Sequence, residues 1–327
     1  MSEDPRVLVG DVGGTHARFA VVDTAAAPWR IDNRVDLDTD FSDFVASLRA
    51  YLDRAGLASL PKAVAIAVAG PVTAGSVVLT NRNWKISEDD LRAFGFADAL
   101  LVNDFAALAF AVGALPAGSF HVIGPDLAGL VGEPISVLGA GTGFGAACLA
   151  RFHGRAVPVA TEGGHVGFAP GDDREADVLK VLARRFGHVS VERVLSGPGM
   201  ENLHSALAAL DGRPPSPLSA AEIVARHESD PLCRETVDMF CAIYGTVAGD
   251  FALAHGARGG VFLAGGIAQK IEPVLQASSF RARFERKGRL SGYVTAIPTR
   301  LILSEDTAFL GVANASREFR GDIRTVS

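Results

Sequence analysis

The stretch VLVGDVGGTHARFAVV, residues 7–22, decides the fold. A short β-branched run is broken by Gly13 and Gly14, and apolar residues then resume on alternate positions. The pattern therefore predicts two strands joined by a glycine-rich turn, rather than a strand followed by a helix. Glycines let backbone N–H groups approach an anion closely, while Thr15 adds a hydroxyl donor and Arg18 a nearby positive charge. We predict a phosphate-binding hairpin.

Asp11 ends the first of these strands and is a candidate for holding Mg²⁺ through water. The hairpin lacks the Lys-Ser/Thr pair and the following helix of a Walker A loop, so it would bind nucleotide phosphates by a different scheme. These residues alone leave a plain alternative open, a tight hairpin with glycines at its positive-φ positions.

Bulk composition favours a two-domain α/β enzyme. The chain has 327 residues, 48% of them hydrophobic, and a net charge of −6. The chain is longer than a single hydrophobic core usually supports, which favours two domains. Its moderate charge is typical of a well-packed globular fold. Basic residues do not form a block with aromatics, which argues against a nucleic-acid groove and predicts a solvated helix face for the cationic run 281–287. A small-molecule substrate is expected.

Three cysteines, Cys148, Cys233 and Cys241, form neither a paired framework nor a C-x-x-C ligand set. We therefore expect the cysteines to be buried, small apolar residues of a protein in a reducing compartment, and we expect no structural zinc site. The first apolar run is too short for a signal peptide, and the apolar stretch 97–115 contains acids that are costly in lipid. We expect a cytoplasmic protein that contacts no membrane.

Residues 135–149, ISVLGAGTGFGAACL, repeat the opening pattern of strand, glycine-rich turn with a threonine, and strand when Gly139 is laid on Gly10. This predicts a second phosphate hairpin, with Gly141, Thr142 and Gly143 in its turn. Two related hairpins indicate two domains, one closing on a nucleotide from each side.

The domain boundary is predicted within 116–125, a segment rich in Gly and Pro. The predicted small α/β domain comprises residues 1–115 and 305–327, because the last helix is expected to return to it. The predicted large α/β domain comprises residues 116–304.

A competing pattern overlaps the second turn. Gly141-x-Gly143-x-x-Ala146 matches the dinucleotide fingerprint of oxidoreductases. The fingerprint requires a helix after the glycines, whereas residues 146–152 predict a strand. The oxidoreductase interpretation is therefore disfavoured.

Asp104 is the candidate general base. Residues 100–102 predict a strand that ends at Asn103-Asp104 and passes directly into an Ala-rich helix over 105–114. Open α/β sheets bind their ligands at such junctions. An Asp there can accept the proton of a substrate hydroxyl during phosphoryl transfer. The alternative is that Asp104 only caps the helix.

Glu162, His165 and Glu192, with Asn103, are candidates for binding a polyhydroxylated substrate. Sugar hydroxyls both donate and accept hydrogen bonds, so carboxylate, imidazole and amide groups can pair with them. The alternatives are a surface turn for residues 162–165 and a first-turn helix acid for Glu192. Metal binding is a weaker possibility, because the ligands are few and far apart.

Several motifs occur in an order that resembles the bacterial glucokinases of the hexokinase and actin-like superfamily: DVGGT at 11–15, NDF at 103–105, GAGTG at 139–143, EGGH at 162–165, ERVLSGPG at 192–199 and AGGI at 264–267. The resemblance spans nearly the whole chain. It implies a two-domain hexokinase-like (ribonuclease H-like) fold with an interdomain cleft. The implied activity is ATP-dependent phosphorylation of D-glucose at its 6-hydroxyl, at the entry to glycolysis.

The resemblance also implies roles, residue by residue. It implies Asp104 as the base, and as glucose contacts Asn103, Asp104, Glu162, His165 and Glu192. For ATP it implies Gly13, Gly14 and Thr15 in a first phosphate motif, Gly141, Thr142 and Gly143 in a second, and Gly265 and Gly266 in an adenosine motif. Family members are commonly homodimers.

The sequence departs from the family pattern at His16, where Asn is usual, and at Ala308, where Gly is usual. The Cys-rich zinc motif of the related repressor and sugar-kinase family is missing, which favours the zinc-free glucokinase branch. Two alternatives stay open: a kinase for another hexose such as mannose or fructose, and a non-catalytic sugar sensor. Asp104, the two hairpins and the lack of an appended DNA-binding helix pair argue against the sensor.

Overall fold

The computed structural model describes residues 4–13, 16–38, 41–79, 84–152, 155–214 and 217–319. Its contacts divide the chain into two units. Unit 1 comprises Met1–Ser119, Arg155–Ala160 and Ser304–Ser327, and unit 2 comprises Phe120–Gly154 and Thr161–Leu303.

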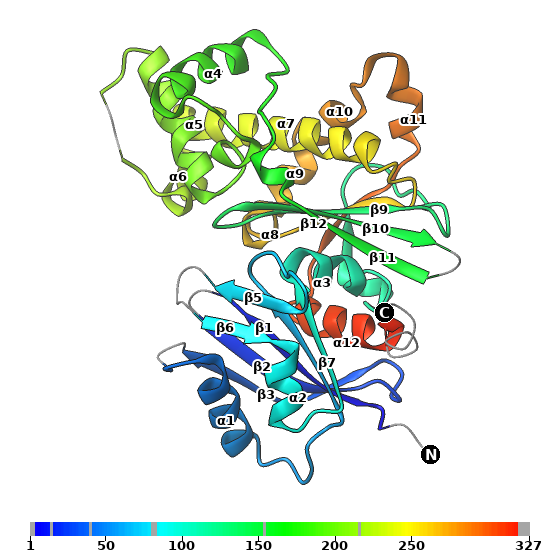
Figure 1. The fold of residues 1–327 in the computed structure, drawn as a ribbon. Helices are drawn as coiled ribbons and strands as arrows, with labels where there is room; N and C mark the ends of the chain where they lie inside the picture. Colours follow the sequence, from blue (N-terminus) through cyan, green and yellow to red (C-terminus); the bar gives the residue numbers. More distant parts are fainter. Residues whose placement is uncertain are drawn as a thin grey trace. The chain divides into compact units, whose positions relative to one another are not determined.

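Unit 1 is built on a five-stranded sheet of order β3-β2-β1-β4-β7. The hairpin β1–β2 is antiparallel, and β4 and β7 continue the sheet parallel to β1. Helices α1 and α2 contribute Phe44, Leu48, Tyr51 and Leu91 to the core on one face, while α3 and α12 pack on each other, with α12 against β1 and β4 (Figure 1). The elements are β1 Arg6–Val12, β2 His16–Asp23, β3 Arg30–Asp38, α1 Phe44–Ala55, β4 Ala63–Val68, β5 Ser76–Leu79, β6 Trp84–Ser87, α2 Glu88–Phe94, β7 Asp98–Asn103, α3 Asp104–Ala111, η1 Ala117–Ser119 and α12 Thr307–Phe319.

Unit 2 contains five strands of a six-stranded sheet of order β11-β10-β9-β12-β13-β8, and the sixth strand, β11, falls in unit 1 except for Thr161. The hairpin β9–β10 is antiparallel, and β12 and β13 run parallel to β9. The elements of this sheet and of the rest of unit 2 are β8 Phe120–Val122, β9 Ile135–Ala140, β10 Phe144–Phe152, β11 Arg155–Thr161, η2 Gly163–His165, α4 Asp173–Phe186, η3 Val191–Arg193, α5 Gly197–Leu210, α6 Ala220–Arg226, α7 Pro231–Ala254, β12 Gly260–Ala264, α8 Gly266–Lys270, α9 Glu272–Ala277, α10 Phe280–Glu285, η4 Gly288–Leu290, α11 Ser291–Thr295 and β13 Thr299–Ile302.

The two sheets repeat one topology, because each places a glycine-turn hairpin beside two parallel strands. The predicted repeat is confirmed, and β10 is a strand, as expected, where the dinucleotide fingerprint needs a helix. The turns differ in length. Residues 13–16 separate the last paired residues Val12 and Ala17, whereas residues 141–143 separate Ala140 and Phe144.

Helix α7 lies along one face of the second sheet and contacts β9 and β12 (Figure 1). It begins with Pro231 after the N-cap Asp230, because Asp suits the N-cap and Pro the first turn of a helix. Within the described part of the chain, α7 alone is long and apolar enough to cross a bilayer, and 72% of its most apolar window is buried inside the protein. Its apolar residues thus serve the core, where Tyr244 donates to the Leu138 carbonyl at 3.2 Å.

One prediction about local structure is wrong. The sequence predicts a break at Gly197-Pro198-Gly199 and a helix from Met200 to Leu210. These three residues instead form the first turn of α5, where proline is well suited and Ser196 is the N-cap. The segment 116–125, where the sequence predicts the domain boundary, contains the division between the units after Ser119 and also contributes β8 to the edge of the second sheet beside β13.

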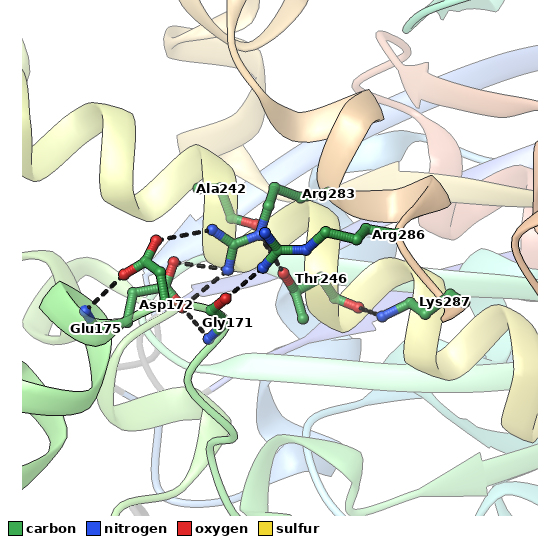
Figure 2. A network of polar contacts seen from close by, with 8 residues as sticks. All are labelled: Gly171, Asp172, Glu175, Ala242, Thr246, Arg283, Arg286 and Lys287. Carbon is green, nitrogen blue, oxygen red and sulfur yellow. Dashed lines mark hydrogen bonds and ion pairs between the residues drawn. The ribbon is translucent and has the colours of Figure 1, made fainter. Parts of the chain in front are cut away.

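The cationic run 281–287 is not the solvated helix face that we predicted. Arg283 is only 8% exposed and pairs with Glu175, which is 1% exposed, and with Asp172 (Figure 2). Arg286 donates to the Gly171 carbonyl, and Lys287 to that of Thr246. A charge in low dielectric is tolerated when it is paired and hydrogen-bonded, so this network ties α10 to α4 and α7.

Candidate functional site

The first glycine turn connects β1 to β2 in unit 1. The Gly13 N–H donates to the His16 carbonyl at 3.0 Å and so shapes the turn itself. Gly14 and Thr15 lie outside the described residues. Asp11 faces Arg18 across the hairpin, and the two side chains form an ion pair. The arginine that the sequence places near the phosphates thus pairs with this acid.

A hollow of about 550 Å³ lies beside this turn. The described residues that line it are Asp11, Gly13, His16, Arg18, Asp36, Leu37 and Asp38. A hydrogen bond from Arg34 lowers the pKa of Asp36, with Arg18 and His16 adding to the effect. The hollow is therefore polar and carries charges of both signs next to the proposed phosphate site.

The junction of β7 and α3 holds Asn103 and Asp104. Asn103 is the N-cap of α3: its Oδ1 accepts from the N–H groups of Phe105 and Ala106 at 3.0 and 3.2 Å, and its Nδ2 donates to the Gly70 carbonyl at 3.2 Å. Asp104 is the first helical residue, and its Oδ1 accepts from the Phe105 N–H at 2.9 Å. The alternative that Asp104 is the cap is therefore wrong, because Asn103 takes that role.

Asp104 and the first turn lie at the same edge of the first sheet, the edge formed by the carboxyl ends of the parallel strands β1, β4 and β7. Val12, Val68 and Asn103 are in register across the parallel strands β1, β4 and β7, so Gly13 and Asp104 each follow a strand at that edge. Two strand spacings separate β1 from β7, which is about 10 Å.

The second glycine turn connects β9 to β10 in unit 2. Its Gly141 N–H donates to the Gly143 carbonyl at 2.8 Å, and Thr142 is exposed at the tip. Gly265 follows β12 beside this hairpin with a φ of +92°, and a Cβ there would lie 2.3 Å from the Ala140 carbonyl oxygen. Glycine at 265 therefore lets the start of α8 approach the end of β9, which brings the predicted adenosine motif to the second phosphate motif.

Glu162 and His165 flank two buried glycines, Gly163 and Gly164, and are themselves exposed. A Cβ on Gly164 would lie 2.0 Å from the Phe144 carbonyl oxygen, so this segment packs directly on β10. The turn is thus anchored to the second hairpin, while its two polar side chains stay accessible to a ligand.

Glu192 belongs to the short helix η3 and is joined to the same region. An antiparallel bridge pairs Gly167 with Ser190, which connects the segment after His165 to the segment before Glu192. The Glu192 Oε2 accepts from the Phe144 N–H at 2.9 Å. This contact between residues 48 positions apart could not be read from the sequence.

Each unit thus gathers its own share of the predicted residues. Unit 1 places Asp11, Gly13, Asn103 and Asp104 at one sheet edge. Unit 2 brings Glu162, His165 and Glu192 to the hairpin that carries Gly141, Thr142 and Gly143, with Gly265 and Gly266 beside it.

Two sheets of one topology, each with a glycine hairpin, define the class of hexokinase-like sugar kinases. The glucokinase family model matches residues 8–319, and the chain belongs to the glucokinase family. A glucokinase from Caulobacter sp. (strain K31) is 49% identical over 94% of both chains, and one from Aromatoleum aromaticum is 44% identical over 94% of this chain and 93% of its own. The crystal structure of a glucokinase from an Antarctic psychrotroph superposes with a TM-score of 0.89 at 37% identity, covering 96% of this chain and 99% of its own.

A second solved structure supports the fold alone. It is a ROK family glucokinase from Streptomyces griseus in complex with glucose and AMPPNP, with a TM-score of 0.63 at 18% identity, covering 96% of this chain and 99% of its own.

Proposed function

We propose that this member of the glucokinase family transfers the γ-phosphoryl group of ATP to the 6-hydroxyl of D-glucose, giving glucose 6-phosphate and ADP. The observation that carries the proposal is the position of Asp104 at the sheet edge that bears the first glycine turn. The relatives named glucokinase and the family model support the same reaction.

Asp104 acts as the general base. It accepts the proton of the 6-hydroxyl while that oxygen attacks the γ-phosphorus, and the backbone N–H of Phe105 fixes its Oδ1. The start of α3 favours the ionised carboxylate, which is the form that accepts a proton. Asn103, Glu162, His165 and Glu192 hold the remaining hydroxyls of the sugar, with Glu192 oriented by Phe144.

The two glycine turns hold the phosphates. Gly13, Gly14 and Thr15 contact them from the first turn, and Gly141, Thr142 and Gly143 from the second. The N–H groups of Gly13 and Gly141 also bond within their own turns and so shape them. Gly265 and Gly266 approach the adenosine.

Asp11 fits a Mg²⁺ that is held mainly by the nucleotide. Magnesium is commonly bound by one or two carboxylates together with substrate phosphates, and Asp11 supplies such a carboxylate beside the first turn. The described residues contain no group of three His, Cys, Asp or Glu side chains able to hold a metal by themselves. When bound, Mg²⁺ neutralises phosphate charge.

A cytoplasmic location and a homodimer belong to the same proposal. The three cysteines are buried and free, which fits a reducing compartment. The homodimer rests on the resemblance to the family and is tested by light scattering during size-exclusion chromatography.

The test of the reaction is a coupled ADP-release assay with glucose, mannose and fructose as acceptors. We expect turnover with glucose and none with 6-deoxyglucose, which lacks the acceptor oxygen. ADP release with mannose or fructose exceeding that with glucose would identify a different hexose kinase. Glucose binding without ADP release would indicate a sugar sensor, and replacing ATP by ADP or polyphosphate identifies the phosphoryl donor.

A further inference from the structure

The second glycine turn is bonded at both ends to the segment that carries Glu192. At one end the Phe144 N–H donates to Glu192 Oε2 at 2.9 Å. At the other end the Gly197 N–H donates to the Gly141 carbonyl, also at 2.9 Å. Ser196 completes the link, because its hydroxyl donates to the Glu192 carbonyl at 2.8 Å. The turn and the carboxylate are therefore parts of one hydrogen-bonded assembly within unit 2.

Gly143 is the residue that lets this assembly close. A Cβ on Gly143 would lie 2.5 Å from Glu192 Oε2, which is closer than real Cβ contacts. The φ of Gly143 lies outside the left-handed region, so the backbone conformation does not itself require glycine. Glycine is needed at position 143 because the Glu192 carboxylate occupies the space that a Cβ would take.

Gly141 in the same turn provides the matched comparison. A Cβ on Gly141 would meet no other atom within 4 Å, and its φ also lies outside the left-handed region. The two glycines belong to one turn and are separated by a single residue, but only at Gly143 would a Cβ overlap Glu192.

We propose that Gly143 is a positioning residue for sugar recognition, because it leaves room for Glu192 to lie against the turn that holds the phosphates. The proposal rests on the proposed function, since it takes Glu192 as a glucose contact. It gives the second glycine turn a role in binding the sugar besides its role with ATP.

The test measures glucose affinity by calorimetry without nucleotide, in the variants Gly143→Ala and Gly141→Ala. In Gly143→Ala the new methyl group meets the flexible end of a side chain rather than backbone, so the fold is kept and Glu192 moves away. We expect glucose to bind about ten- to a hundredfold more weakly, as for the loss of a hydrogen bond to a charged group. Gly141→Ala is expected to keep the wild-type glucose affinity while raising the KM for ATP.

A double-mutant cycle with Glu192→Ala shows whether Gly143 acts through Glu192. Once Glu192 is removed, adding Gly143→Ala is expected to weaken glucose binding by less than a factor of two. The proposal is overturned if the losses of glucose affinity in the cycle are additive, or if the two glycine variants lose equal affinity. It is also overturned if Gly143→Ala binds glucose as tightly as the wild type. A large fall in the melting temperature of Gly143→Ala would also overturn it, because the backbone would then be absorbing the overlap.

The wild-type protein separates this inference from the proposed function. If the wild type releases no ADP with glucose and does not bind it, the proposed function fails. If the wild type phosphorylates glucose and Gly143→Ala binds it normally, only the role of Gly143 fails.

Discussion

Asp104 in unit 1 and Glu192 in unit 2 each accept a backbone N–H at 2.9 Å, yet the donors come from very different places in the chain. The donor to Asp104 is the next residue, Phe105, in the first turn of α3. The donor to Glu192 is Phe144, 48 residues earlier, at the start of β10. A strand-to-helix junction orients the first carboxylate locally, whereas the second is oriented only when two distant segments have packed together.

This difference matches the roles proposed for the two acids. A base that accepts a proton needs a fixed direction, which the helix start supplies together with a favourable dipole. A sugar-binding carboxylate needs a fixed distance from the phosphates, which a bond to the phosphate turn supplies. Substitutions should therefore separate turnover from sugar affinity.

The largest effect is expected for Asp104→Asn. The amide keeps an oxygen that can accept from the Phe105 N–H but cannot act as the base, so kcat should fall by about 10²–10⁴ while glucose affinity stays within a fewfold. Steady-state kinetics and calorimetry measure the two quantities. Asp98→Asn, at the opposite end of β7, is the control and should keep wild-type kcat. Substantial turnover by Asp104→Asn would contradict the assignment of the base.

A smaller and different effect is expected for Glu192→Gln. The amide oxygen can still accept from the Phe144 N–H, so the side chain keeps its place and loses only its charge. Hydrogen bonds to a neutral acceptor are weaker than those to a carboxylate, so KM for glucose should rise about tenfold with kcat within about threefold of the wild type. A fall in kcat as large as that of Asp104→Asn would erase the distinction between the two acids.

The same distinction explains how far the sequence could predict the site. The sequence predicts Asp104 because a strand end followed by a helix start is a local pattern, and the glycine hairpins are local as well. The sequence also predicts Glu192 as a sugar contact. Its hydrogen bond to Phe144 could not be predicted, because neither the sequence around residue 144 nor that around residue 192 indicates it. The partners of Arg283 were missed for this reason, because Glu175 lies 108 positions away and the cationic run by itself resembles an exposed helix face. Asn103 is predicted as a sugar contact, and its role as the N-cap of α3 is not among the sequence predictions.

The smallest effect is expected for a substitution beside Glu192 that leaves its charge intact. It tests whether the packing around Glu192 contributes to glucose binding. Ser196 caps α5 by accepting from the Gly199 N–H at 2.9 Å and also donates to the Glu192 carbonyl. Ser219 caps α6, and its side chain pairs there with Glu222. Ser196→Ala and Ser219→Ala should each cost about 1 kcal/mol of stability, lowering the melting temperature by about 2–4 °C. Only Ser196→Ala should also raise the KM for glucose, by about two- to threefold, because it releases the backbone that carries Glu192. Equal KM values in the two variants would mean that the bond to Phe144 alone fixes the carboxylate.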